Sequence, residues 1–279
     1  VTPAAARGLV EGIKTLTDKP IKYVFNTHYH FDHAHGNQIF GDDVEIIGHD
    51  FVRTMLSSDV LTQRTHRSFT EGLPDQIAQM KARIAETNDA AEREELGAAL
   101  RIQEAHWEAL QETDPTPPNV TYSDTMRLVK GGREVQLHFP GPGHTGGDTL
   151  VFLPDERIVF TGDFFVGRPG GHSLPYMGDG YVEEWPASLD RLKALEFDTM
   201  VPGHGLPFRE RDQIDHLQAY LRDLNRQVNA LYAEGVSVQE AVGRVDLSAH
   251  VRHYGERIAS ADPRAVVRMY ERLQVAMPR

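Results

Sequence analysis

One stretch constrains this chain more than any other: FNTHYHFDHAHGN, residues 25–37, which holds four histidines and one aspartate within thirteen positions. It directly follows an apolar run that is typical of a strand. A single pair such as His28 and His30 would more often be ordinary polar loop residues. Five side chains of metal-binding type in eight residues, His28 to His35, instead indicate a metal site.

Three further side chains of the same type each stand at the predicted end of a strand or in a glycine-rich loop. They are His144 in GPGHTGGDT, Asp163 in FTGDFF and His204 in VPGHG. Imidazole nitrogen and carboxylate oxygen suit Zn²⁺, and a set of seven such ligands exceeds what one tetrahedral ion needs. It fits two ions, which in dinuclear sites lie about 3.5–4 Å apart. The chain has no cysteine, so thiolate ligands and cysteine nucleophiles are excluded.

These motifs together resemble those of the metallo-β-lactamase superfamily of metallohydrolases. Four motifs carry the resemblance, over roughly residues 1–210: HxHxDH at 28–33, GHTGGD around His144, TGD ending at Asp163, and PGHG around His204. The resemblance implies an α/β fold, a four-layered αββα sandwich of two mixed sheets between outer helices. Family members usually have several strands before the histidine motif, whereas 27 residues precede His28 here. We therefore expect the first strands of the fold to be missing.

The resemblance also implies how the ligands are shared between two zinc ions. One ion would be held by His28, His30 and His144, and the other by Asp32, His33 and His204, with Asp163 as the bridge. The implied activity is that of a dinuclear zinc-dependent hydrolase, which attacks an ester, thioester, lactone or amide with a metal-bound hydroxide. Asp32 would be the catalytic residue that orients this hydroxide and takes its proton.

The aspartate at position 163 favours one branch of the superfamily. Dedicated β-lactamases typically have cysteine or serine there, whereas a bridging aspartate is the pattern of glyoxalase-II-like thioesterases, lactonases and many generic hydrolases. We therefore expect the chain to belong to the second group. Two alternatives stay open: a metallo-β-lactamase that hydrolyses β-lactams, and an oxidoreductase that resembles persulfide dioxygenases with a single iron.

Residues 164–181, FFVGRPGGHSLPYMGDGY, are predicted to form the substrate loop, because they are rich in glycine and aromatic residues and lie between two ligands. Arg168, His172 and Tyr176 are the candidates for contact with a substrate carboxylate or oxyanion. A purely structural role as loop residues with hydrogen bonds is equally consistent with each of them.

The remaining pattern predicts alternating short strands and helices. Thr2-Pro3 is typical of a helix start, and strands are predicted within 19–27, 43–49, 126–140, 149–163 and 198–205. Residues 74–112 predict an inserted pair of helices, either a lid over the substrate pocket or a surface hairpin that adds stability or a dimer contact. An apolar seam from Ile214 to Leu231 predicts a helix packed on its own domain and ended by Gly235. We predict a catalytic domain at 1–210 and a C-terminal helical extension at 211–279.

Charge and hydropathy restrict the partners. The chain has 29 Lys and Arg against 41 Asp and Glu, a net charge of −12, and no basic block, which disfavours nucleic acid. No apolar run reaches the roughly 18 residues of a membrane span, so we expect a soluble protein without a membrane partner. No signal peptide is evident, which leaves cytoplasm and periplasm both open. A small-molecule substrate is expected, and the helical segments are candidate surfaces for a homo-oligomer.

Overall fold

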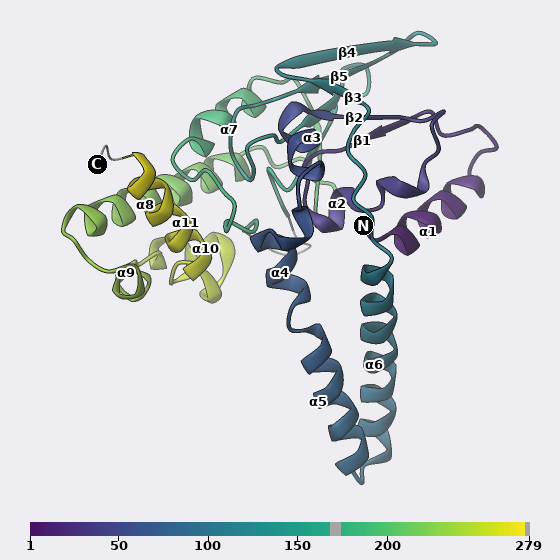
Figure 1. The fold of residues 1–279 in the computed structure, drawn as a ribbon. Coiled ribbons are helices and arrows are strands. Elements are labelled where there is room, and N and C mark those ends of the chain that lie inside the picture. Colours follow the sequence, from purple (N-terminus) through teal and green to yellow (C-terminus); the bar gives the residue numbers. More distant parts are fainter. Residues whose placement is uncertain (168–173, 277–279) are drawn as a thin grey trace. The chain divides into compact units, whose positions relative to one another are not determined.

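The structure is a computed structural model that describes residues 1–167 and 174–276 (Figure 1). The chain divides into two compact units. Unit 1 comprises Val1–Val24, Tyr29–Ile46 and Arg53–Asn119, and unit 2 comprises Phe25–His28, Ile47–Val52 and Val120–Arg279. The chain passes from one unit to the other within the HxHxDH motif, after His28.

Unit 1 is mainly helical. Its helix α1 begins as the sequence predicts, because the Thr2 side chain accepts a hydrogen bond from the Ala5 backbone N–H at 3.3 Å and proline occupies the first helical position. The short helix α2 carries the second half of the HxHxDH motif. The helices of this unit are α1 (Pro3–Lys14), α2 (Phe31–Ala34), η1 (Asn37–Ile39), η2 (Val60–Thr62), α4 (Arg64–Thr70), α5 (Leu73–Glu86) and α6 (Ala90–Gln111).

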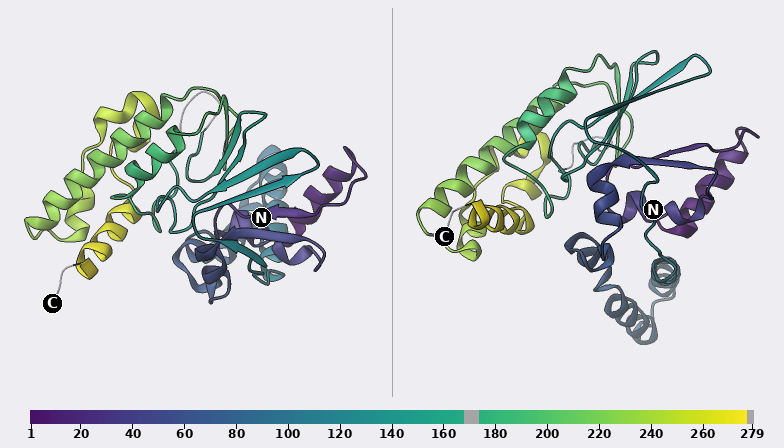
Figure 2. Two further views of the ribbon diagram at one scale, coloured as in Figure 1. Left: turned by 90° about the horizontal axis from the view of Figure 1, so that it is seen from above. Right: turned by 45° about the horizontal axis from the view of Figure 1, so that its top comes forward.

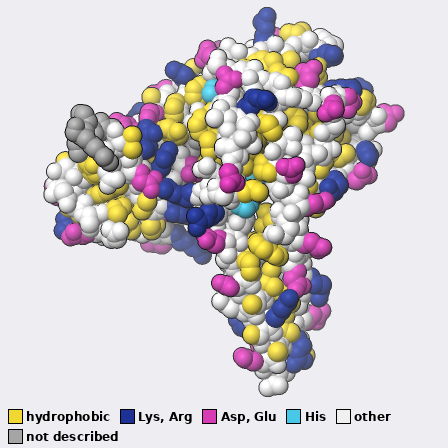
Figure 3. All heavy atoms as spheres, viewed as in Figure 1, with side chains coloured by type: hydrophobic (Ala, Val, Ile, Leu, Met, Phe, Trp, Pro, Cys, Tyr) yellow, Lys and Arg dark blue, Asp and Glu magenta, His cyan; other side chains and the backbone are white. Residues whose placement is uncertain are grey.

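Helices α5 and α6 form an antiparallel hairpin, which confirms the inserted pair of helices predicted at 74–112 (Figure 1). Lys81 of α5 pairs with Glu104 of α6 at 2.7 Å, which shows that these two positions lie side by side. Their buried residues lie only at the base of the hairpin, and they are Leu73, Ile77 and Leu110. Further out, half-buried apolar side chains line the hairpin on the face seen in Figure 3.

We expect the outer part of the hairpin to be dispensable for folding. Replacing residues 82–103 by a short Gly-Ser linker removes none of the buried residues, so little core burial is lost. The midpoint of thermal unfolding should then stay within about 4 °C of that of the unaltered chain, the shift that about 1 kcal/mol produces in a domain of this size. A much larger drop in this midpoint would show that the outer part of the hairpin contributes substantially to the stability of the core. The lid hypothesis requires the same variant to change relative rates across substrates.

The residues that the structure describes form two sheets. One has the order β1-β2-β3 and the other the order β4-β5-β6-β7-β8. In the second sheet β4 to β7 are antiparallel neighbours, and β8 pairs in parallel with β7. The predicted Gly-Gly turn joins β4 to β5, with φ of 59° at Gly131 and 82° at Gly132. The strands are β1 (Tyr23–Phe25), β2 (Glu45–His49), β3 (Val120–Tyr122), β4 (Thr125–Lys130), β5 (Arg133–His138), β6 (Leu150–Leu153), β7 (Ile158–Gly162) and β8 (Thr199–Pro202).

Unit 2 contains the five-stranded sheet and the C-terminal helices. Helix α8 runs beside α7 (Figure 2), and the Gln218 side chain donates a hydrogen bond to the Pro186 carbonyl at 2.7 Å. The apolar seam of α8 is buried in the core of this unit, together with Trp185 and Met200, so the prediction that it packs on its own domain is confirmed. The helices are α7 (Trp185–Lys193), α8 (Gln213–Ala233), α9 (Val238–Arg244), η3 (Ser248–His250), α10 (Val251–Tyr254), η4 (Glu256–Ile258) and α11 (Pro263–Ala276).

The α/β architecture with a helical hairpin and a helical C-terminal extension is therefore as the sequence predicts. Helix α3 (Asp50–Leu56) begins at Asp50 directly after β2. Gly235, with φ of 74°, follows the end of α8, as its position in the sequence predicts. Within the described part of the chain, no helix is both long and apolar enough to cross a bilayer.

Candidate metal centre

Four of the predicted ligands belong to unit 2, and Asp163 lies among them. Asp163 follows β7 directly, His204 follows β8, and His144 lies in the loop between β5 and β6. One carboxylate oxygen of Asp163, Oδ2, lies 3.4 Å from Nε2 of His204 and 3.8 Å from Nε2 of His144. The rings of His28 and His144 meet edge to face with their centroids 4.8 Å apart. These side chains thus converge from loops that rigid strands hold in place.

Glycine at two strand ends makes this convergence possible. A Cβ on Gly203 would lie 2.1 Å from Oδ1 of Asp163, closer than any carbon can approach. The Gly203 backbone N–H donates to the Gly162 carbonyl at 2.8 Å, so β8 ends directly against the start of the Asp163 loop. Gly162 has φ of 52° and packs against Thr27, the residue before His28. Because a side chain at either position would clash, these glycines allow the loops that bear His28, Asp163 and His204 to approach closely.

The loop that bears His144 is held by a buried carboxyl group. Asp148 is 1% exposed and accepts hydrogen bonds from the Thr145 backbone N–H at 2.9 Å and from the Thr145 hydroxyl at 2.7 Å. Burial raises the pKa of Asp148 to about 8, although the hydrogen bonds from Thr145 act in the opposite direction. Asp148 thereby closes the GHTGGD loop on itself and fixes the backbone beside His144.

The other three predicted ligands belong to unit 1. His30 immediately precedes α2, and Asp32 and His33 lie in its first turn, where Oδ2 of Asp32 is 3.3 Å from Nε2 of His33. His30 is 3% exposed, and its Nε2 lies 3.3 Å from the hydroxyl oxygen of Thr65 on α4. The Asp32 side chain is 34% exposed, so solvent reaches it.

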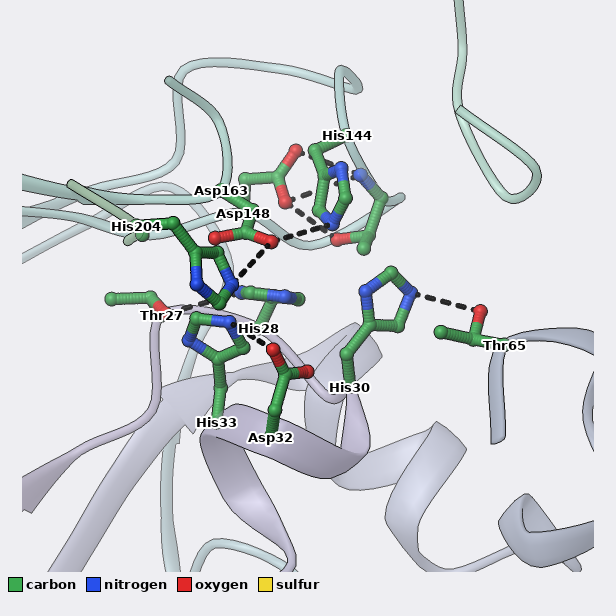
Figure 4. Close-up of polar contacts among 12 residues, drawn as sticks. Thr27, His28, His30, Asp32, His33, Thr65, His144, Asp148, Asp163 and His204 are labelled. Atoms are coloured by element: carbon green, nitrogen blue, oxygen red, sulfur yellow. Dashed lines mark hydrogen bonds and ion pairs between the residues drawn. The ribbon is translucent and has the colours of Figure 1, made fainter. Parts of the chain in front are cut away.

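The seven side chains belong to two sets of donors that the motifs imply (Figure 4). The two sets are His28, His30 and His144, and Asp32, His33 and His204, with Asp163 beside His144 and His204. Three imidazoles in one group, and two imidazoles with two carboxylates in the other, are donor sets that divalent zinc accepts. The residues present therefore fit two such ions.

The predicted substrate residues are placed only in part. Arg168 and His172 lie outside the described residues. Tyr176 is half-buried, and the guanidinium of Arg264 lies over its ring at 4.8 Å from the centroid. The end of the predicted substrate loop contacts the loop that bears His144, because the Tyr181 backbone N–H donates to the Gly143 carbonyl at 2.8 Å. A substrate role for these side chains stays a prediction.

Three polar residues beside the ligands were not anticipated from the sequence as parts of the site. The Thr27 hydroxyl lies 3.1 Å from Nδ1 of His28, Thr65 contacts His30, and Asp148 supports the His144 loop. Asp148 and Thr27 stand inside or next to the ligand motifs, so a search for polar neighbours of those motifs would find them. Thr65 lies 35 positions from His30, and nothing in its local sequence distinguishes it.

Comparison with known proteins supports the reading of these motifs. A family model described as the metallo-beta-lactamase superfamily matches residues 3–46 and 75–204. A linear primary-alkylsulfatase from Pseudomonas sp. (strain ATCC 19151) is 26% identical over 269 residues, which are 89% of this chain and 47% of the relative. The chain thus spans about half, or less, of the length of the curated relatives it matches.

Solved structures show the same fold. A metallo-beta-lactamase from Pontibacter korlensis aligns with a TM-score of 0.54 at 19% identity, over 77% of this chain and 76% of the other. A variant of the sec-alkyl sulfatase PisA1 aligns with a TM-score of 0.63 at 15% identity, over 99% of this chain and 45% of the other. The family model covers more than half of the 279 residues. The chain therefore belongs to the metallo-β-lactamase superfamily.

Proposed function

We propose that the chain is a dinuclear zinc hydrolase that cleaves an ester, thioester, lactone or amide by attack of water on the carbonyl carbon. The observation that carries the proposal is the position of Asp163. Its Oδ2 lies 3.8 Å from His144, a member of the first ligand group, and 3.4 Å from His204, a member of the second. A carboxylate that neighbours both groups is placed to bridge two ions.

The ligand groups divide the two ions as follows. His28, His30 and His144 would hold one ion, and Asp32, His33 and His204 the other, with Asp163 shared. When bound, two zinc ions supply Lewis-acid chemistry: they acidify water and draw electrons from the carbonyl oxygen. The carboxylates of Asp32 and Asp163 contribute two negative charges against the four positive charges of the ions, which favours an anionic nucleophile or substrate group in the site.

The protein's own contribution to the reaction is positioning and proton transfer. Asp32 is solvent-accessible, and its Oδ2 lies 3.3 Å from Nε2 of His33. Its other oxygen can accept the proton of an attacking water, the role of a general base. The buried histidines need no charge for their role, because the neutral imidazole is the ligand form. Neither a serine nor a cysteine nucleophile is required.

A sulfate ester is the second candidate substrate. The alkylsulfatase relative aligns over 89% of this chain, and an alkyl sulfatase structure aligns over 99% of it, including the helical C-terminal extension. Water cleaves a sulfate ester, as it cleaves a carboxylate ester, into an acid and an alcohol. The aspartate at position 163 favours the hypothesis of a carbonyl substrate. The length of these alignments favours the hypothesis of a sulfate ester substrate.

Hydrolysis in ¹⁸O-labelled water separates the two candidates. The zinc-loaded chain is assayed with a lactone, a thioester, a β-lactam and a primary alkyl sulfate, with the metal-free chain as control. We expect turnover of a carbonyl substrate with one ¹⁸O in the product carboxylate. Turnover of the alkyl sulfate alone, with label in sulfate or alcohol, would support the second candidate instead. Oxygen consumption with a persulfide and no hydrolysis would contradict both and favour the oxidoreductase alternative.

A further inference from the structure

Helix α4 lies in a stretch that the family model does not match. The model matches residues 3–46 and 75–204, so residues 47–74 are outside it. Within unit 1, α4 nevertheless contacts the metal motif directly. The first of its contacts is the Thr65 hydroxyl against Nε2 of His30 at 3.3 Å (Figure 4). Both residues are 3% exposed, so this polar contact is shielded from water.

Three contacts between aromatic rings hold α4 in this place. The Phe69 ring packs against Phe31, the first residue of α2, with centroids 5.5 Å apart. The His66 ring meets Phe31 edge to face at 6.2 Å and stacks on His35 at 5.9 Å. Because Thr65, His66 and Phe69 share one side of a single short helix, their contacts fix the Thr65 hydroxyl relative to His30.

A hydroxyl group that accepts a hydrogen bond from one ring nitrogen of a histidine determines which nitrogen can bind a metal. A neutral imidazole carries one proton, and the protonated nitrogen donates while the other offers its lone pair. If Nε2 of His30 donates to the Thr65 oxygen, Nδ1 is the nitrogen that offers a lone pair. His28 shows the opposite arrangement, because the Thr27 hydroxyl lies 3.1 Å from its Nδ1. The two histidines of the motif thus have hydroxyl partners on different nitrogens.

We propose that Thr65 is a positioning residue for His30: its hydroxyl oxygen accepts a hydrogen bond from the Nε2–H of His30, orients the ring and leaves Nδ1 to the metal. The proposal rests on the metal-binding role assigned to His30 under the proposed function. Partners that hydrogen-bond to a ligating histidine typically change metal affinity by about 10- to 100-fold. Here the partner lies on α4, which is outside the residues that the family model matches.

Two substitutions at Thr65 and one matched control test the proposal. Thr65→Val keeps the shape and removes the hydroxyl, whereas Thr65→Ser keeps the hydroxyl. Thr70→Val is the control, because Thr70 is a buried threonine of the same helix whose hydroxyl donates to the His66 carbonyl at 2.8 Å. Zinc affinity is measured by competition with a chromophoric chelator. The tautomer of His30 is read in the metal-free protein from its ¹⁵N chemical shifts by NMR.

We expect Thr65→Val to weaken the binding of one zinc ion by about 10- to 100-fold, Thr65→Ser to restore most of the affinity, and Thr70→Val to leave it unchanged. His30 of the unaltered chain should carry its proton on Nε2. A proton on Nδ1, or equal zinc affinity with valine and threonine, would overturn the inference. If the Thr65→Val protein does not fold, the tautomer of His30 and the zinc affinity of Thr65→Ser still test the proposal. Zinc binding without any hydrolysis would contradict the proposed function alone.

Discussion

Asp163→Asn is expected to lower turnover by at least about 100-fold and to reduce bound zinc from two ions per chain towards one. The substitution keeps the shape of the side chain and removes its negative charge. Asp163 is 6% exposed and lies within 4 Å of histidines from both ligand sets. Because the position is buried, a carboxylate from the solution cannot enter and take the place of the lost side-chain charge. An amide attracts two cations much less strongly than a carboxylate does, and the ions lose the charge that offsets their mutual repulsion.

Metal analysis and steady-state kinetics on the same preparation check this prediction. Asp155→Asn is the matched control, because Asp155 is an exposed aspartate in the turn between β6 and β7. It should leave zinc content and rate unchanged. An Asp163→Asn protein that keeps two ions and a near-normal rate would show that Asp163 is not the bridge.

Gly203→Ala is expected to damage the site through sterics alone. The new Cβ would lie 2.1 Å from Oδ1 of Asp163 and 2.8 Å from its backbone nitrogen, so the loop after β7 or the end of β8 must move. Overpacking of this kind typically costs about 1–3 kcal/mol. The displacement falls directly on the Asp163 carboxylate, so zinc affinity should fall with stability, although alanine removes no ligand.

Gly243→Ala provides the comparison. Gly243 lies in α9, where a Cβ would have nothing within 4 Å, so alanine should be neutral or stabilise the helix by about 0.5–1 kcal/mol. Thermal unfolding and chelator competition measure the two effects separately. Normal zinc affinity in Gly203→Ala would mean that the close approach of β8 to Asp163 is not needed for the metal centre.

Much of the fold follows from local signals in the sequence. The Thr2-Pro3 start of α1, the turn at Gly131 and Gly132 and the end of α8 near Gly235 each depend on one or two residues with a strong conformational preference. The hairpin of α5 and α6 was predictable because a long stretch almost free of glycine and proline favours helix. In such places a local rule and the tertiary structure agree.

The candidate metal ligands were also recognised from the sequence, but for a different reason. Each ligand stands in a short motif at the end of an apolar strand, and sheet geometry brings such ends together. Seven residues of ligand type in that context are informative even though each one alone is not. Within unit 2, Asp163 lies beside His144 and His204, one histidine from each set that the motifs imply, and the metal-binding roles of all seven residues stay predictions.

Residues that act through long-range contacts could not be predicted. Thr65 lies on α4, a short helix without a clear apolar period, and its contact with His30 depends on how α4 packs against Phe31. Strand β3 is three residues long and pairs with β2 across more than 70 positions, so its pattern is too short to detect. Asp148 was visible within a motif, but only the structure shows that its carboxyl group closes the loop beside His144.

The most direct test of the dinuclear assignment is a zinc titration of the metal-free chain that follows bound metal and hydrolysis together. The chain is stripped with a chelator and zinc is returned in steps, with metal content read by mass spectrometry. Activity should be absent without metal, should reach its maximum at two equivalents per chain, and should not rise further. Full activity at one equivalent, or activity that survives complete removal of metal, would contradict the two-ion centre built on Asp163.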